Sequence, residues 1–287
     1  MSKNRATLTG FAAILMWALL ALFTVGASEV PPLLLNAACF AIGGTIGLIW
    51  IGASGGFAAL RHVPLAVYGF GTAALFGYHL LYFSALRLAP AAEASLIAYL
   101  WPLLIVIFSG FLPGERLTRT HVLGALVAFA GAALIVAGNG LGLSAAALPG
   151  YGLALLCALT WSGYSLISRR LGAVPTAAVA VFCIASAVLS ALAHLMLEET
   201  VWPGTARGWL SVLALGLGPV GLAFYTWDVG VKRGDIQLLG TASYAAPLLS
   251  TLVLVATGVA AASLKLVLAA ALITTGALLA AWASRSR

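Results

Sequence analysis

Ten stretches of about 20 mainly apolar residues follow one another along this 287-residue chain, joined by short connections. Each stretch is long enough to cross a bilayer as a helix. The apolar runs are continuous, whereas strands of a membrane β-barrel alternate apolar and polar residues. We therefore predict an all-α integral membrane fold with ten transmembrane helices, at 7–28, 32–53, 64–86, 91–112, 121–138, 149–169, 175–197, 207–229, 236–258 and 263–284.

Charged residues are too scarce for a soluble protein. They make up 7% of the chain, against about 25% in a soluble domain, and cannot cover a water-facing surface. The first stretch begins with Lys3 and Arg5 and resembles a secretory signal. Because its apolar run is long and the next span follows at once, we expect it to be retained as the first helix.

Positive charges predict the orientation of the spans. With the N-terminus in the cytoplasm, 11 of the 14 lysines and arginines fall on the cytoplasmic side, and only Arg87, Arg207 and Lys265 fall outside. Both termini are then cytoplasmic. The net charge of +7 reflects this bias towards an anionic leaflet, so we expect a lipid bilayer as partner and no nucleic acid.

The chain also contains an internal repeat. Pro247 lies 145 residues after Pro102, and two leucines follow each proline. The same offset, within one residue, relates Tyr99 to Tyr244 and Trp17 to Trp161.

We divide the repeat into two halves, 1–140 and 141–287, with five predicted spans each. An odd number of spans inverts the second half across the membrane, so Arg87 and its counterpart Lys232 should lie on opposite faces. Inverted repeats around a central cavity are typical of transporters, whose binding site lies where the halves meet.

Pro102 and Pro247 each fall near the middle of a predicted span. Proline inside a helix removes a backbone hydrogen bond, costs about 3 kcal/mol, and leaves a carbonyl that must find another partner in lipid. The result is either a packing kink or a hinge beside a mid-membrane cavity. Duplication at equivalent positions favours the hinge.

Aromatic residues inside the spans are the candidate substrate site. Tyr78 and Tyr82 share a helix face, and His79 lies on an adjoining one. Trp101 lies too deep for the aromatic belt at the membrane surface. The full set of candidates is Tyr78, His79, Tyr82, Trp101, Trp17, Trp161, Tyr99 and Tyr244.

The repeat ranks these candidates. Trp101, Tyr78 and His79 have different residue types at their repeat positions, whereas Tyr99 and Tyr244 are twins. Because a substrate is not symmetric, we expect its pocket where the halves differ, which favours the first three.

Acidic residues give little sign of ion coupling. Asp228 lies four residues before Lys232 near a span end, so we expect an exposed pair; Glu93 should lie in the first turn of a helix, where an anion is stabilised. We therefore expect facilitated efflux or exchange instead of strict proton antiport.

Enzyme motifs are weak. Residues 52–56 fit the G-x-S-x-G pattern with Ser54 as nucleophile, which leaves an intramembrane serine protease as a remote alternative. The motif lies in a short loop, where small residues form turns. No phosphate-binding loop occurs, and the three cysteines lack metal spacing, so we expect no cofactor and no metal.

The stretch from Tyr82-Phe83-Ser84-Ala85-Leu86-Arg87 to Pro102 resembles a segment of the drug/metabolite transporter superfamily, and the Gly114-Glu115-Arg116-Leu117 turn is also similar. The resemblance covers essentially the full chain and is greatest to bacterial aromatic amino-acid exporters of the YddG type. At the matching turn of the second half, Val259-Ala260 replace the expected Gly-Glu.

This resemblance implies a basket-like bundle around a central cavity in the bacterial inner membrane, with export from the cytoplasm by alternating access. Aromatic walls suit aromatic side chains and ammonium groups, and His79 with unwound backbone would meet the carboxylate. The expected cargo is aromatic and other neutral amino acids, carried by a monomer. A drug or other metabolite exporter of the same superfamily is the alternative.

Overall fold

The computed structural model describes residues 1–137, 144–258, 261 and 263–285, and the regular elements in these ranges are all helices. The predicted boundary after residue 140, the Val259-Ala260 pair and Arg287 lie outside the described residues. In chain order the helices are α1 Lys3–Ala18, α2 Leu20–Gly26, α3 Pro32–Ser54, α4 Phe57–Leu60, α5 Leu65–Leu88, α6 Ala91–Ala98, α7 Trp101–Ser109, α8 Arg119–Val136, η1 Ala145–Ala147, α9 Leu148–Arg170, α10 Ala178–Leu197, α11 Ala206–Leu217, η2 Gly218–Leu222, α12 Ala223–Arg233, α13 Ile236–Ala242, α14 Ala245–Ala256 and α15 Leu264–Arg285.

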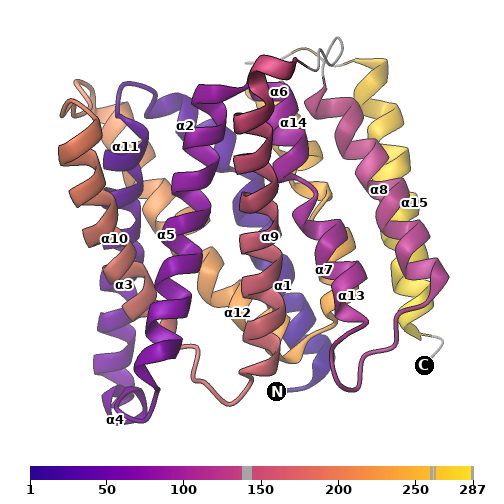
Figure 1. Cartoon of the computed structure of the whole chain (residues 1–287), viewed down its shortest axis with the longest axis horizontal. Coiled ribbons are helices and arrows are strands. Elements are labelled where there is room, and N and C mark those ends of the chain that lie inside the picture. Colours follow the sequence, from indigo (N-terminus) through magenta and orange to yellow (C-terminus); the bar gives the residue numbers. More distant parts are fainter. Residues whose placement is uncertain (138–143, 259–260, 262, 286–287) are drawn as a thin grey trace.

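Within the described ranges, nine helical segments are long and apolar enough to cross a membrane, and each coincides with a predicted span. The remaining prediction, 64–86, corresponds to α5, which has 24 residues and runs beside the others through the bundle (Figure 1). It is not among the nine, and its sequence contains three tyrosines, a histidine and an arginine. The count of ten spans stays a prediction.

Local sequence signals explain where several helices begin. Proline, whose fixed φ suits a helix start and which has no N–H to satisfy, is the residue just before α3, α5 and α6. The side chains of Thr118, Thr205 and Asp235 accept hydrogen bonds from the first-turn N–H groups of α8, α11 and α13.

Spans four and nine are each broken into two helices. The first pair, α6 and α7, separates at Tyr99-Leu100; the second, α13 and α14, separates at Ser243-Tyr244. Pro102 and Pro247 lie just after these breaks, in the first turn of the following helix. The prolines were predicted to interrupt their spans at equivalent places, and the structure confirms this.

Two further interruptions were not predicted. Span one is divided at Leu19, between α1 and α2. Span eight contains a π-helical turn, η2, between α11 and α12, and Pro219 lies in it. The indole N–H of Trp17 donates to the Pro219 carbonyl over 3.1 Å, which satisfies a carbonyl in this irregular turn.

Arg87 and Lys232 lie at opposite ends of α10. Arg87 donates to the carboxylate of Glu198, which directly follows α10, and the Lys232 ammonium donates to the carbonyl of Val174, which precedes it. A helix of 20 residues is about 30 Å long, so the two cations are separated by roughly a membrane thickness. This is the separation that the inverted repeat predicts.

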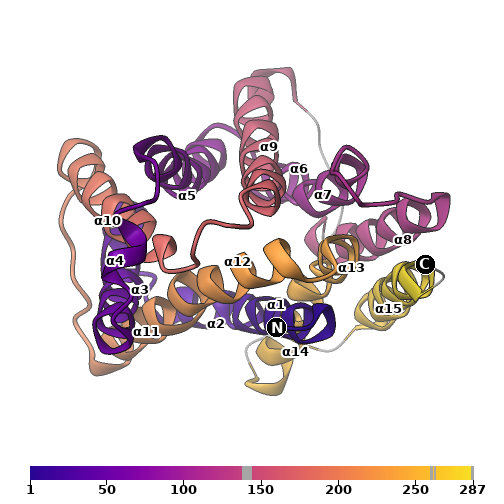
Figure 2. The same ribbon diagram turned by 90° about the horizontal axis from the view of Figure 1, so that it is seen from below.

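The bundle is arranged around two central helices. Figure 2 shows α1 and α12 side by side in the middle, α3, α10 and α11 at one edge, and α8 with α15 at the other. The N-terminus and the end of α15 lie at the same end of the bundle, which we call the terminal end (Figure 1).

Glycines allow the closest helix contacts in the bundle, above all between α8 and α15. A Cβ added at Gly131 would lie 2.9 Å from the carbonyl oxygen of Ala269, and one at Gly124 would lie 2.7 Å from that of Gly276. These are backbone atoms, so they cannot move aside as a flexible side chain can. The α8–α15 pair therefore packs backbone against backbone.

We predict that Gly124→Ala destabilises the bundle, because the new methyl group pushes α15 away from α8 at a cost of about 1–3 kcal/mol. Thermal unfolding of the detergent-solubilised protein should show a lower Tm. Gly69→Ala on α5 is the matched control, since a Cβ there meets no atom within 4 Å. Equal melting temperatures for the two variants would contradict the proposed packing.

Candidate functional site

Four tryptophans from four helices contact one another in the middle of the bundle. Trp17 of α1, Trp101 of α7, Trp161 of α9 and Trp227 of α12 form all six possible ring pairs, with centroids 5.1 to 6.3 Å apart. We call them the tryptophan cluster. Four of the six pairs are edge-to-face, a preferred geometry for aromatic rings. The cluster joins residues from both predicted halves of the chain.

Hydrogen bonds hold two of the four indoles in place. The Trp227 indole N–H donates to the Ser165 hydroxyl over 3.0 Å, and that hydroxyl donates to the Trp161 carbonyl. The Trp17 indole N–H is held by the Pro219 carbonyl. Trp227 has no exposed surface, and Trp161 and Trp101 have 3% and 6%. The cluster is therefore a packed and oriented group.

A second group of rings on α5 extends the cluster. Tyr78 contacts Trp161 at 5.5 Å, and Tyr82 stacks on Tyr78 at 6.3 Å, which confirms that the two tyrosines share a helix face. The Tyr82 hydroxyl shares a 3.0 Å hydrogen bond with the Ser95 hydroxyl of α6. Tyr78 and Tyr82 are both half-buried.

His79 packs among rings from two other helices. It contacts Phe40 of α3 at 5.1 Å and Phe224 of α12 at 6.3 Å, and Phe224 in turn contacts Trp161. Its Nδ1 lies 2.8 Å from the carbonyl oxygen of Leu75. Because a carbonyl only accepts, this partner assigns the proton to Nδ1, and Nε2 of the neutral ring is an acceptor. An acceptor suits an ammonium group, the opposite of the carboxylate partner that we expected for His79.

Tyr244 lies outside the tryptophan cluster. It is fully buried against Phe129, and its hydroxyl accepts a 3.0 Å hydrogen bond from the backbone N–H of Leu103 beside the break in span four. Tyr99, half-buried at that break, packs against the same group of apolar residues as Tyr244, which includes Leu103 and Phe129. The structure thus brings together six of the eight candidates, and it places Tyr99 and Tyr244 at the helix breaks.

Trp227, Phe40 and Phe224 were missed in the sequence. One signal for Trp227 and Phe224 was present, because they lie 145 residues after Tyr82 and His79. When equivalent positions of the two halves both carry aromatic rings, each half is expected to contribute rings to the interior of the bundle. Nothing in the pattern around Phe40 singled it out.

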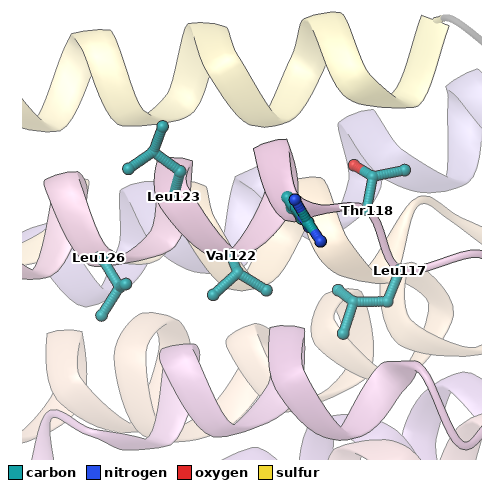
Figure 3. A pocket seen from close by; sticks show the side chains of 6 residues that line it. Leu117, Thr118, Val122, Leu123 and Leu126 are labelled. Atoms are coloured by element: carbon teal, nitrogen blue, oxygen red, sulfur yellow. The ribbon is translucent and has the colours of Figure 1, made fainter.

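Two hollows are described in the structure, and no residue of the tryptophan cluster lines either of them. The first, of about 410 Å³, is a shallow hollow along α8 (Figure 3), lined by Leu117, Thr118, Arg119, Val122, Leu123 and Leu126. Its lining contains none of the aromatic candidates. The central cavity therefore stays a prediction, which the half-buried state of Trp17, Tyr78 and His79 supports.

The second hollow, of about 10 Å³, lies beside Asp228 and Lys232. These side chains form a 2.9 Å ion pair and expose only 1% and 5% of their surface. The Thr176 hydroxyl also donates to the Asp228 carboxylate. Our expectation of an exposed pair was wrong, because the 171–177 connection, which carries Val174 and Thr176, packs over it.

Further charged contacts close the terminal end of the bundle. Arg169, at the end of α9, pairs with Glu115 and donates to the carbonyls of Val231 and Gly234. Lys3 pairs with Asp235 at 3.1 Å. Burial raises the pKa of Asp235, but the Leu238 N–H and the Lys3 ammonium outweigh burial and hold that pKa below its usual range. We call these contacts and the Asp228–Lys232 pair the terminal seal.

Ser54 does not have the geometry of a nucleophile. It is the last residue of α3, and its hydroxyl donates to the carbonyl of Ile51 over 3.2 Å. Gly55, which follows, has a φ of 68° and ends the helix in the left-handed conformation. The small residues of the motif therefore form a helix end.

Comparison with known families decides the class of protein. The model of the EamA-like transporter family matches this sequence twice, over residues 4–137 and 148–282. The chain belongs to the EamA-like transporter family. It is a multi-pass membrane protein of a transporter family and not an enzyme, which removes the protease alternative.

Curated relatives include several named exporters. The chain is 54% identical to an aromatic amino acid exporter, YddG, of Ancylobacter novellus, over 99% of this chain and all of that one. It is 24% identical to the Escherichia coli exporter of the same name over 88% of both chains. A pseudopaline exporter of Pseudomonas aeruginosa is 33% identical, over only 49% of this chain and 48% of that one.

A crystal structure with the same fold is also known. It shares 54% sequence identity with this chain, covers 99% of both chains, and superposes with a TM-score of 0.95. The expected resemblance to the drug/metabolite transporters, and within them to the YddG-type exporters, is thus confirmed by sequence and by fold.

We predict that removing one charge of the Asp228–Lys232 pair destabilises the protein more than removing both. Asp228→Asn leaves a buried ammonium, and Lys232→Met leaves a buried carboxylate; each should cost about 3–5 kcal/mol. The double variant leaves no unpaired charge and should regain part of the lost stability. Thermal unfolding in detergent measures all three, and additive losses would contradict the pairing.

Proposed function

We propose that this protein exports aromatic and other neutral amino acids across the bacterial inner membrane. The observation that carries the proposal is the tryptophan cluster with Tyr78 and His79, which lies where the two halves of the chain meet. Ring walls favour aromatic side chains, by about 0.5–1.5 kcal/mol per ring pair beyond buried area, and attract ammonium groups. The name of the relative at 54% identity supports the same cargo.

The transport step is alternating access between the two five-helix halves, 1–140 and 141–287, with both termini in the cytoplasm and one copy of the chain sufficient. Two observations support it. The family matches twice, once in each half, and Arg87 and Lys232 lie at opposite ends of the bundle. The breaks before Pro102 and Pro247 are then the hinges about which the halves rock.

In this orientation the terminal seal faces the cytoplasm. The Arg169–Glu115 and Lys3–Asp235 pairs would then hold the cytoplasmic side closed. Substrate would enter from the cytoplasm after the seal opens and leave on the other side after it closes again. The two states must lie within a few kcal/mol of each other for cycling.

A second cargo class, a drug or other metabolite, is favoured by one observation: the partial similarity to a pseudopaline exporter. A panel in reconstituted vesicles separates the two. Phenylalanine, tryptophan, threonine, a nucleoside and a cationic dye are compared at equal concentration. Transport of the nucleoside or the dye without the amino acids would overturn the amino-acid proposal.

We predict that Trp101→Ala and His79→Ala each reduce phenylalanine transport by at least tenfold, because each removes a ring that contacts several others at the proposed site. The measurement is the initial rate of uptake into proteoliposomes, with folding checked by gel filtration. Trp209→Ala is the control: that ring is 49% exposed on α11 and stacks on Trp202. Normal rates in both site variants would remove the assignment.

We predict that an imposed pH gradient leaves the initial rate of phenylalanine transport unchanged within about twofold. The physical reason is that Asp228, which directly follows Trp227 of the tryptophan cluster, is already neutralised by Lys232 and bonded to Thr176. Facilitated efflux or exchange then needs no proton. Vesicles with equal and unequal pH across the membrane test this, and transport that occurs only with a gradient would refute it.

A further inference from the structure

The four indoles of the tryptophan cluster differ in what their N–H groups contact. Those of Trp17 and Trp227 are taken by the Pro219 carbonyl and the Ser165 hydroxyl. Those of Trp101 and Trp161 have no hydrogen-bond partner within the described part of the chain. Fully buried polar atoms without a partner, among the described residues, are the Tyr164 hydroxyl and the Ser186 hydroxyl. The two unpaired indole N–H groups are not in this fully buried set, so each keeps some exposed surface.

An indole N–H inside an aromatic site and without a protein partner can donate to an acceptor on a bound ligand. Indole nitrogen donates and never accepts, so its partner must carry lone pairs. The two rings that carry these donors lie 6.3 Å apart and nearly perpendicular, at 85°. A carboxylate has two oxygens, so it can accept one N–H···O bond of about 2.9 Å from each of two neighbouring rings. The fixed Trp17 and Trp227 indoles, which contact both rings, keep the two donors in position.

A hydrogen-bond acceptor, the counterpart of the two indole donors, is found on α5. His79 Nδ1 donates to the Leu75 carbonyl, so Nε2 presents a lone pair, and it too has no partner among the described residues. His79 contacts Tyr78 at 5.3 Å, and Tyr78 contacts Trp161 at 5.5 Å. A ligand that reaches from the indole donors to this acceptor must carry an acceptor at one end and a donor at the other.

We propose that the indole N–H groups of Trp101 and Trp161 bind the carboxylate of a zwitterionic amino acid and that His79 Nε2 binds its ammonium group. This inference rests on the proposed amino-acid cargo. It assigns the orientation of the bound amino acid, with the carboxylate towards Trp101 and Trp161 and the ammonium group towards His79. Neutral groups hold both ends of the zwitterion. The side chain of the amino acid is then left to the ring walls, which accept more than one shape.

The test separates the N–H group from the ring that carries it. Trp101 and Trp161 are replaced, one at a time, by benzothienylalanine, a tryptophan isostere in which sulfur takes the place of N–H. The same replacement at Trp209, on the exposed face of α11, is the matched control. Phenylalanine counterflow in proteoliposomes gives KM, with phenethylamine, which lacks the carboxylate, and 3-phenylpropionate, which lacks the ammonium, as competitors.

We expect each site isostere to raise KM for phenylalanine at least tenfold and to weaken phenylpropionate similarly, while the inhibition constant of phenethylamine changes less than twofold. His79→Phe, which keeps a ring and removes the acceptor, should weaken phenylalanine and phenethylamine and spare phenylpropionate. The Trp209 isostere should behave like the wild type.

Equal weakening of all three ligands by the isosteres would show a packing role and overturn the inference, as would an unchanged KM for phenylalanine. If neither analogue competes even with the wild type, phenylalanine alone decides: loss at positions 101 and 161 but not at 209 supports the inference. Absence of phenylalanine counterflow in the wild type is a different result, because it refutes the proposed cargo itself.

Discussion

A helix inside a bilayer has no water to bond with, so any interruption of its backbone hydrogen bonds needs a partner from the protein. In this protein aromatic side chains supply such partners. The Tyr244 hydroxyl accepts the Leu103 N–H beside the break in span four, and the Trp17 indole donates to the Pro219 carbonyl in the π-helical turn of span eight. Tyrosine and tryptophan fit this role because each joins a large apolar surface to one polar atom.

This constraint also explains where the candidate site lies. Trp17 reaches η2 with its N–H and places its ring against Trp101, Trp161 and Trp227. The residue that stabilises an irregular turn is thus a member of the tryptophan cluster. Irregular backbone and ring-lined interior occur together because irregular backbone in a membrane is tolerated only where protein or a cavity surrounds it.

Much of the fold was predictable from the sequence. Apolar run lengths located nine of the spans, and the 145-residue offset between Pro102 and Pro247 predicted matched interruptions in spans four and nine. The breaks at Leu19 and at Gly218–Leu222 were not predicted. The second depends in part on a tertiary partner, because Trp17 bonds the Pro219 carbonyl from 202 residues away in the chain.

The candidate site was predicted in part. Asymmetry between the halves selected Trp101, Tyr78 and His79, which the structure brings together, but Trp227 was overlooked because its match to Tyr82 across the repeat was not used. Asp228 was misjudged for another reason. Its position near the end of the predicted span suggested that the side chain is exposed. Its burial is instead decided by contacts with Thr176 and Val174, which lie more than 50 residues away in the chain.

Trp227 and Asp228 are consecutive residues of α12, pointing about 100° apart around the helix axis. One belongs to the tryptophan cluster and the other to the terminal seal. Any rotation of α12 that displaces the Trp227 ring would therefore also move the Asp228 carboxylate relative to Thr176, which lies in the 171–177 connection. Neighbouring residues of one helix thus tie the packing of the central rings to the contacts that close the terminal end.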